Sequence, residues 1–292
     1  MLYLKNISLI ILFSISISLL HAQKIKVSEV SIAPGVYSEG NPSATVNDFY
    51  MLAPNSQLLP GSLNGYKTYG NYGNNGGYTS SILLGFRFLD KDQNEYKANP
   101  LLRVGVTYKS ADVISAYIFK ETHSTIDTLV SQSTGQTYLL DSISYEGYGL
   151  NYHSQQIKLD ASVIFRTNPE ARWLLFGGFG GTIGATINNK TSINYHQYSY
   201  TSPENEDVLF FPNNPRNHNF QNESFINQNS IVYSVYVPLG VDFRISNNNE
   251  FWKRIHLFYE MQPTLNFTPI PELRTFTNIA FQNNLGIKIS WL

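Results

Sequence analysis

The ten residues NNLGIKISWL, at positions 283–292, decide the fold of this chain. From position 285 to 291, the odd-numbered residues are apolar or aromatic, and the even-numbered residues are glycine, lysine and serine. Successive side chains of a β-strand point to opposite faces, so this stretch predicts a strand with one apolar and one polar face. Such a strand suits a place where its two faces meet two different environments.

The same alternation recurs through most of the sequence, which predicts about eight strands. Besides the terminal strand, the segments are 27–37, 80–90, 101–109, 156–166, 173–187, 231–245 and 255–261. The first is the least regular, because Val27 differs in parity from Val30 and Ile32. Several segments are longer than the ~9–11 residues that cross a bilayer at a tilt.

The composition favours a membrane barrel and argues against a nucleic-acid-binding protein. Charged residues make up 14% of the chain, against about 25% in an ordinary soluble domain. The 20 tyrosines and 18 phenylalanines contrast with 3 methionines, and the formal charge of −1 provides no basic field for nucleic acid.

Residues 1–22 have the features of a secretory signal peptide. Lys5 supplies the basic region, an apolar run extends from Ile7 to Leu20, and the small residue Ala22 precedes the expected cleavage site. A membrane anchor is the weaker alternative, because the run is shorter than the ~20 residues of a spanning helix. With no cysteine, the exported chain has no disulfide, lipid-attachment cysteine or thiolate site. We expect residues 23–292 to form one domain.

The connections alternate between short and long. Residues 90–100, 167–172 and 246–254 read as short polar turns, whereas the other four links are longer and rich in Asn, Ser, Gly and Tyr. With an even number of strands and both termini in the periplasm, all short turns lie at one end and all long loops outside, as in an outer-membrane barrel. A soluble β-sandwich also alternates, but its strands are shorter and its exposed face is charged.

We therefore predict an all-β fold, a transmembrane antiparallel up-and-down β-barrel of about eight strands with a partly helical first outer loop over 38–77. In its signal peptide, its alternating strands and the aromatic Trp291 near its end, the chain resembles the small outer-membrane β-barrel family, OmpA/OmpX-like in shape. The Ala22–Gln23 junction and the Asn- and Tyr-rich loops are similar to those of Bacteroidota members.

The resemblance implies a bacterial outer-membrane location and contacts with outer-membrane lipid and lipopolysaccharide. It also implies recognition of the C-terminal strand by the barrel-assembly machinery, although an aromatic residue usually stands at the last position, which here is Leu292. We expect a monomer.

Two loops are candidate binding regions. In SATVNDFYMLAPNS, at 43–56, Ser43 or Thr45 can cap a helix that Pro54 ends. This segment is either a lid over the barrel mouth or a ligand-binding face, with Phe49 and Tyr50 as candidate contacts. A second loop is predicted from Tyr195–Tyr200 together with the Asn-rich stretch Phe211–Asn229. Tyrosine and asparagine there suit adaptable recognition or a plain solvated loop. Its candidate contacts are Tyr195, Tyr198 and Tyr200.

The polar strand faces predict a lumenal charge network. Its members are Arg87, Arg103, Lys158, Asp160, Arg166, Asp242, Arg244, Glu260 and Lys288, with Glu29 as a further carboxylate. In a narrow interior these charges must pair, because an unpaired buried charge is costly. A structural salt-bridge core is favoured over an ion path, since side chains fill an eight-stranded barrel.

No catalytic residue, metal site or cofactor is predicted. Residues 90–101 begin like a calcium loop but have Glu95 where glycine is needed and Leu101 where glutamate is needed. His153 and Ser154, with Glu146 nearby, are the best local catalytic candidates, and His123 with Ser124 comes next. Adjacent strand residues point to opposite faces, so such a histidine cannot readily activate its neighbour. Thr128 and Ser142 lie in short motifs resembling O-glycosylation acceptors of Bacteroidota.

Three functions remain open. The leading hypothesis is a structural or surface-recognition barrel whose outer loops bind a surface or secretion-apparatus partner that the sequence does not identify. The second is a small passive or gated pore. The third, and least favoured, is a lipid-modifying barrel enzyme.

Overall fold

The computed structural model describes residues 25–40, 44–62, 64–69, 75–90, 95–130, 132–168, 171–203 and 218–291. The predicted signal peptide at 1–22 therefore lies outside the described residues. The elements are β1 (Ile25–Glu39), α2 (Val46–Leu52), β2 (Lys67–Tyr69), β3 (Asn75–Asp90), β4 (Glu95–Tyr96), β5 (Leu101–Val130), β6 (Thr137–Arg166), β7 (Trp173–Pro203), β8 (Asn219–Ile226), β9 (Ile231–Tyr236), β10 (Leu239–Arg244), the 3₁₀ helix η1 (Trp252–Arg254), β11 (Ile255–Pro269) and β12 (Thr275–Ser290).

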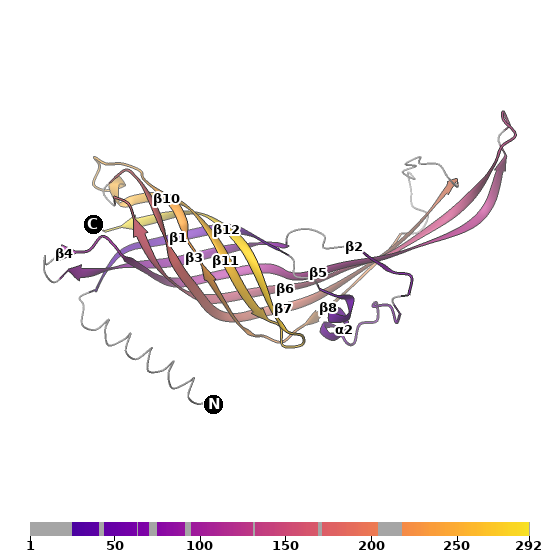
Figure 1. The fold of residues 1–292 in the computed structure, drawn as a ribbon, viewed down its shortest axis with the longest axis horizontal. Coiled ribbons are helices and arrows are strands. Elements are labelled where there is room, and N and C mark those ends of the chain that lie inside the picture. The colour runs from indigo at the N-terminus through magenta and orange to yellow at the C-terminus, as the bar shows by residue number, and fades with distance from the viewer. Residues whose placement is uncertain are drawn as a thin grey trace.

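The strands close into an antiparallel barrel (Figure 1). Around the ring, β1 pairs with β3, β3 with β5, β5 with β6 and β6 with β7, and β11 pairs with β12, which returns to β1. Both β9 and β10 pair with β7 and β11, so together they fill one position. They are separated at Pro238, which has no amide hydrogen for the ladder. The predicted eight-stranded, up-and-down barrel is confirmed.

The parity of the terminal strand is as predicted. Leu285 and Ile287 point outward, with exposed fractions of 66% and 54%, whereas Lys288 points inward and is 6% exposed. Along the whole barrel, apolar side chains cover the exterior and charged side chains line the interior. This arrangement is the reverse of a water-soluble barrel, so the exterior is suited to lipid.

Three strands are about twice as long as the others. Strands β5, β6 and β7 have 30, 30 and 31 residues, whereas β11 and β12 have 15 and 16. They continue past the barrel as a sheet, flanked by β2 along β5 and by β8 along β7. We call this sheet, residues 114–130, 137–152 and 189–203 with β2 and β8, the blade; it extends far from the barrel end opposite the end of β12 (Figure 1).

The blade corrects two sequence predictions. The strands predicted at 101–109, 156–166 and 173–187 are too short, and the loop predicted over 195–229 contains the end of β7 and all of β8. Apolar alternation ends where the outer face leaves the lipid, but strand pairing continues because the segments are rich in Tyr, Thr and Ile, which favour strands.

The predicted helix in the first long loop is confirmed as α2, with Thr45 as its cap. The Asp48 amide donates to Thr45 Oγ1 at 3.3 Å, and the Thr45 amide donates to Asp48 Oδ2 at 2.7 Å, a capping box. Phe49 is fully buried among side chains of β5, β6 and β7 such as Ile118 and Leu150. Among the described residues, no helix is long and apolar enough to cross a membrane.

Ile287→Arg tests the lipid-facing parity. A charge on the lipid face of a barrel costs roughly 2–4 kcal/mol near the bilayer midplane, so we expect a reduced folded fraction in outer-membrane preparations. Ile126→Arg is the matched control, because Ile126 is 55% exposed on the blade, which lies beyond the lipid-facing surface of the barrel. Heat-modifiable gel migration measures the folded fraction of each variant. Equal folding of the two variants would contradict the assignment of the exterior.

Candidate functional site

The lumen is crossed by ion pairs between strands that are not neighbours in the ring. Arg103 on β5 pairs with Glu260 on β11 at 2.6 Å. Arg166 Nη1, on β6, lies 3.0 Å from Glu29 Oε2, on β1. Lys109 Nζ lies 3.1 Å from Glu39 Oε2, nearer the blade. All these side chains are nearly inaccessible, so the pairs act as cross-braces.

A second part of the network gathers around Asp242. Its carboxylate accepts from Lys288 and lies 2.6 Å from His256 Nδ1. The other ring nitrogen of His256 is 3.1 Å from Ser290 Oγ. Lys288 also lies 3.7 Å from Glu29, which joins the two parts. These ion pairs join six residues of the predicted network into a salt-bridge core: Glu29, Arg103, Arg166, Asp242, Glu260 and Lys288.

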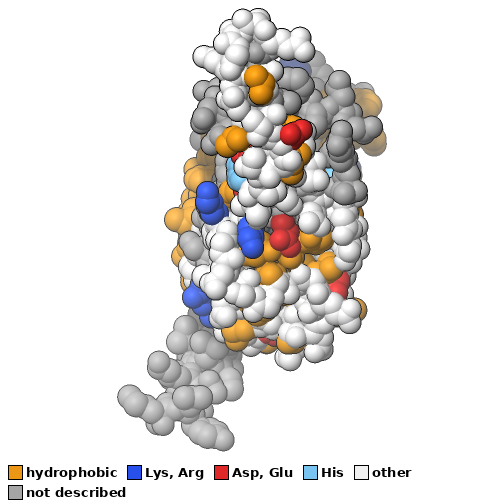
Figure 2. Space-filling view, turned by 90° about the vertical axis from the view of Figure 1, so that its right-hand side faces the viewer, with side chains coloured by type: hydrophobic (Ala, Val, Ile, Leu, Met, Phe, Trp, Pro, Cys, Tyr) orange, Lys and Arg blue, Asp and Glu red, His pale blue; other side chains and the backbone are white. Residues whose placement is uncertain are grey.

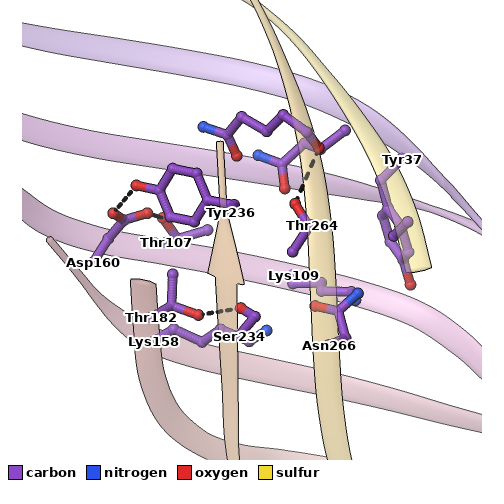
Figure 3. A pocket seen from close by; sticks show the side chains of 13 residues that line it. Tyr37, Thr107, Lys109, Lys158, Asp160, Thr182, Ser234, Tyr236, Thr264 and Asn266 are labelled. Carbon is purple, nitrogen blue, oxygen red and sulfur yellow. Dashed lines mark hydrogen bonds between the residues drawn. The ribbon is translucent and has the colours of Figure 1, made fainter. Parts of the chain in front are cut away.

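Asp160 and Lys158 take different places in this core. Asp160 accepts hydrogen bonds from Thr107, at 3.0 Å, and from Tyr236, at 2.5 Å. Lys158 is 4% exposed and lines a cavity of about 20 Å³ with Asn266 and Gln262 (Figure 3). A cavity of this size holds about one water molecule.

The two remaining members of the predicted set lie toward the short-turn end. Arg87 is near Glu29 and Arg166 but is only partly buried. Arg244 is 7% exposed on β10. A second cavity of about 20 Å³ lies among Glu29, Arg103 and Asp242. Side chains thus fill most of the interior.

The mouth of the barrel at the blade end is covered by an apolar plug. We use this name for α2 and the following residues to 60, with the β11–β12 connection. Phe49, Leu52, Ile270 and Phe276 pack together there with side chains of β5 and β6. Glu223 on β8 holds the plug, accepting from Ser56 Oγ at 2.6 Å and from the Gln57 amide at 3.2 Å. The lid interpretation of this loop agrees with the packing.

The outward face of the blade carries a row of stacked rings, which we call the aromatic platform: Tyr117, Phe119, Tyr145, His196, Tyr198 and Tyr200. The rings of Tyr145 and Tyr198, on neighbouring strands, are 4.8 Å apart and nearly parallel. Tyr117 Oη lies 2.8 Å from His196 Nε2 across the intervening strand.

Gly147 makes the platform continuous. A Cβ atom at this position would lie 2.5 Å from His196 Nε2 and 2.8 Å from Tyr117 Oη, closer than real Cβ atoms approach. Desolvation by the surrounding rings lowers the pKa of His196, and nearby His218 adds to this. The ring is therefore neutral near pH 7 and can accept from Tyr117.

The loop candidates fall in different environments. Phe49 belongs to the buried plug, and Tyr50 donates to the Pro60 carbonyl beside it. Tyr195 points to the plug side, where its ring centroid is 5.0 Å from that of Tyr148. Tyr198 and Tyr200 belong to the platform, and Tyr198 also lines an open hollow of about 530 Å³ with His218 and Asn219. Only these last two lie on an outward face.

A third group, which the sequence analysis missed, lies on the exterior at the base of the blade. Ser110 Oγ is 3.0 Å from His153 Nε2, and His153 Nδ1 is 2.7 Å from Asp112 Oδ1. Pairing of β5 with β6 sets Asp112 directly opposite His153. The serine lies 43 positions from the histidine in sequence, so only knowledge of the register could have joined them.

The structure separates the catalytic pairs that were weighed from sequence. Ser154 is fully buried and faces inward, whereas His153 faces outward. His123 lies 2.9 Å from Glu121 on the exposed hairpin. Among the described residues, no three His, Cys, Asp or Glu side chains are grouped to hold a metal ion; of the calcium-like segment, 91–94 lie outside the described part.

Comparison with known proteins gives likenesses of overall shape alone. No protein-family model and no curated protein matches the sequence. Similar solved structures include Neisserial surface protein A (11% identity, covering 92% of this chain and 99% of that one, TM-score 0.36). Another is Ail, the attachment invasion locus protein of Yersinia pestis (13% identity, covering 91% of this chain and 100% of that one, TM-score 0.25). A third is OmpT, an outer membrane protein of Vibrio cholerae (8% identity, covering 92% of this chain and 98% of that one, TM-score 0.17). At these TM-scores the likenesses support no argument about function.

Glu260→Ala tests the cross-braces of the lumen. It leaves Arg103 buried without its carboxylate, which costs about 3–5 kcal/mol in a comparable buried pair. Glu250→Ala is the matched control, since Glu250 lies 2.6 Å from Lys253 but its side chain is 78% exposed. Urea unfolding in phospholipid vesicles, followed by tryptophan fluorescence, should show a lower midpoint for Glu260→Ala alone. Coincident midpoints would show that the lumenal pairs do not brace the barrel.

Proposed function

We propose that this chain is a bacterial outer-membrane barrel that presents a recognition surface on its blade, with a lumen closed to solutes. The observation that carries the proposal is the aromatic platform. A soluble surface rarely keeps so many rings in one outward-facing row unless they make contact with something. Tyrosine supplies large, rigid contact area with a polar end, which suits recognition.

The blade is a stiff support for such a surface. Its inner face packs on the plug: Phe49 is buried with Ile118 and Leu150, and Glu223 anchors the plug to β8. Its outer face, which points away from the plug, carries the aromatic platform. Seen from the blade end, charges of both signs are scattered among uncharged polar atoms (Figure 2). A polysaccharide, which can stack its sugar rings on aromatic side chains and form hydrogen bonds, fits this surface better than a partner bound by net charge.

Other parts of the proposal follow from the resemblance noted in the sequence. They are export by the signal peptide, a Bacteroidota-type outer membrane, contacts with lipid and lipopolysaccharide, and assembly through β12 as a monomer. The blade end is then extracellular and the short turns are periplasmic. Glycosylation at Thr128 or Ser142 would lie on the exposed blade hairpin, since both residues are in its paired strands.

The pore hypothesis is the alternative, and conductance separates the two. The filled lumen and the apolar plug lead us to expect no stepwise current from the purified protein in planar bilayers. A variant lacking residues 44–60 loses the helical part of the plug but keeps the lumenal pairs, and it should also stay closed. Stepwise current through the wild-type protein would support the pore and refute the closed barrel.

Recognition by the platform is tested with the double substitution Tyr145→Ser and Tyr198→Ser. We expect it to abolish binding of the nanodisc-embedded protein to arrays of bacterial and extracellular-matrix polysaccharides, measured by biolayer interferometry. Ile126→Ser is the matched control, because Ile126 is exposed on the same sheet beyond the platform. Equal binding by the double variant, or no binding by the wild type, would refute glycan recognition through this face.

A further inference from the structure

The group at the base of the blade has the connectivity of a serine hydrolase triad. Asp112 lies against one ring nitrogen of His153, and the other ring nitrogen is within hydrogen-bonding distance of the Ser110 hydroxyl. With the Nδ1 proton held by the carboxylate, Nε2 is free to accept the serine proton. We propose that Ser110, His153 and Asp112 form a catalytic site for O-acyl esters of membrane lipids, a second activity independent of recognition by the platform.

The depth of the group in the barrel indicates the class of substrate. On β5, Val106 faces lipid and is 45% exposed, and Ser110 comes four residues further toward the blade. The same change from apolar to polar occurs on β6, between Ile157 and His153. Tyrosines Tyr78 and Tyr108 mark this level, as tyrosine does at membrane interfaces. Lipid acyl esters lie at this boundary between hydrocarbon and headgroup.

A cation beside the group fits a phosphorylated lipid. Lys190 on β7 pairs in register with His153, and its side chain is exposed on the outward face. An ammonium group there can meet the phosphate of a lipid whose ester bond lies at Ser110. Glycerophospholipids and acylated, phosphorylated saccharolipids share this chemistry.

The tyrosines also supply donors for the reaction. The hydroxyls of Tyr78 and Tyr108 are 3.4 Å apart. Tyr78 on β3 is the register partner of Ser110, and Tyr108 lies two residues before Ser110 on the same face of β5. They are placed to donate to an oxyanion that forms at the ester carbonyl. Ser110 itself is 2% exposed, whereas Tyr78 is 53% exposed. Tyr78 stands opposite Ser110 in the ladder and packs on Tyr108 at the exposed surface, so rotation of its side chain would open Ser110 to a lipid.

The reaction then follows from the roles of these groups. Ser110 Oγ attacks the carbonyl carbon while His153 Nε2 takes its proton, and the ester C–O bond breaks as His153 returns the proton to the alcohol. Water next attacks the acyl-serine, again losing a proton to His153. The fatty acid leaves, and Ser110 regains its hydrogen. One ester and one water give one alcohol and one fatty acid.

The lumen contains a similar arrangement that serves as an internal control. Asp242, His256 and Ser290 are linked in the same order, at 2.6 and 3.1 Å. All three are 1–4% exposed and face the interior, and Lys288 shares the carboxylate. A lipid cannot reach this serine, so we assign it to the salt-bridge core.

The test uses the full-length protein folded in phospholipid vesicles. A fluorophosphonate probe, followed by peptide mass spectrometry, should label Ser110 and not Ser290. Free fatty acid release is measured separately from phosphatidylethanolamine and from lipid A, so that the two sources are distinguished. Release from either supports the proposal. Folded wild-type protein that neither takes up the label nor releases fatty acid from either lipid would overturn it.

Variants make the test specific. Ser110→Ala should abolish labelling, and His153→Gln or Asp112→Asn should lower fatty acid release by about 10³-fold or more. Ser290→Ala should leave both readouts unchanged, and heat-modifiable migration confirms folding of each variant. Polysaccharide binding should survive Ser110→Ala, so failure of this proposal differs from failure of the recognition function. Undiminished release by Ser110→Ala would refute the site.

Discussion

The pairing of β1 with β12 is the interaction on which the rest of the structure depends. It joins the two ends of the sheet from Glu29 opposite Ser290 to Glu39 opposite Ala280, so that each described strand of the ring pairs on both sides. Within lipid, an unpaired backbone amide or carbonyl costs several kcal/mol. Closure also fixes which side chains point inward and which point outward. The lumenal ion pairs and the lipid-facing exterior both depend on this division.

Two bulges link the barrel to the blade by changing that division. The ladder of β5 with β6 shifts between Asp112 and Ile114, and that of β7 with β6 shifts at Gln155 and Gln156. In β6 the odd-numbered residues point outward on both sides of the bulges. In β5 and β7 the residues that point outward change from one parity to the other at the bulge. Ile114 and Ile118 therefore turn inward onto the plug, and Tyr117 turns outward into the platform. A bulge re-aims side chains in this way wherever it occurs.

These bulges explain how far the sequence could predict the molecule. Within the barrel, alternation identified the strands, the inward charges and the lipid-facing parity of β12, because every residue that faces lipid must be apolar. Beyond the lipid, both faces of the blade meet mixed surroundings, so the pattern that marks a strand fades and the segment at 195–200 reads as a loop. The helix at α2 was found because capping and a following proline are local signals. Pairs such as Arg103 with Glu260 need the register, which one sequence does not provide.

The two Ser–His–Asp groups show why composition alone could not separate structure from chemistry. Both arise from polar side chains on neighbouring strands, where cross-strand distances favour hydrogen bonding. The lumenal group is nearly inaccessible and shares its carboxylate with Lys288, so a lipid ester cannot reach its serine. The group at Ser110 lies on the lipid side, at the level where ester bonds lie, with exposed Tyr78 and Lys190 beside it. The same three residue types thus brace the interior in one place and form the proposed catalytic site in the other. The difference is the face of the barrel on which the residues lie.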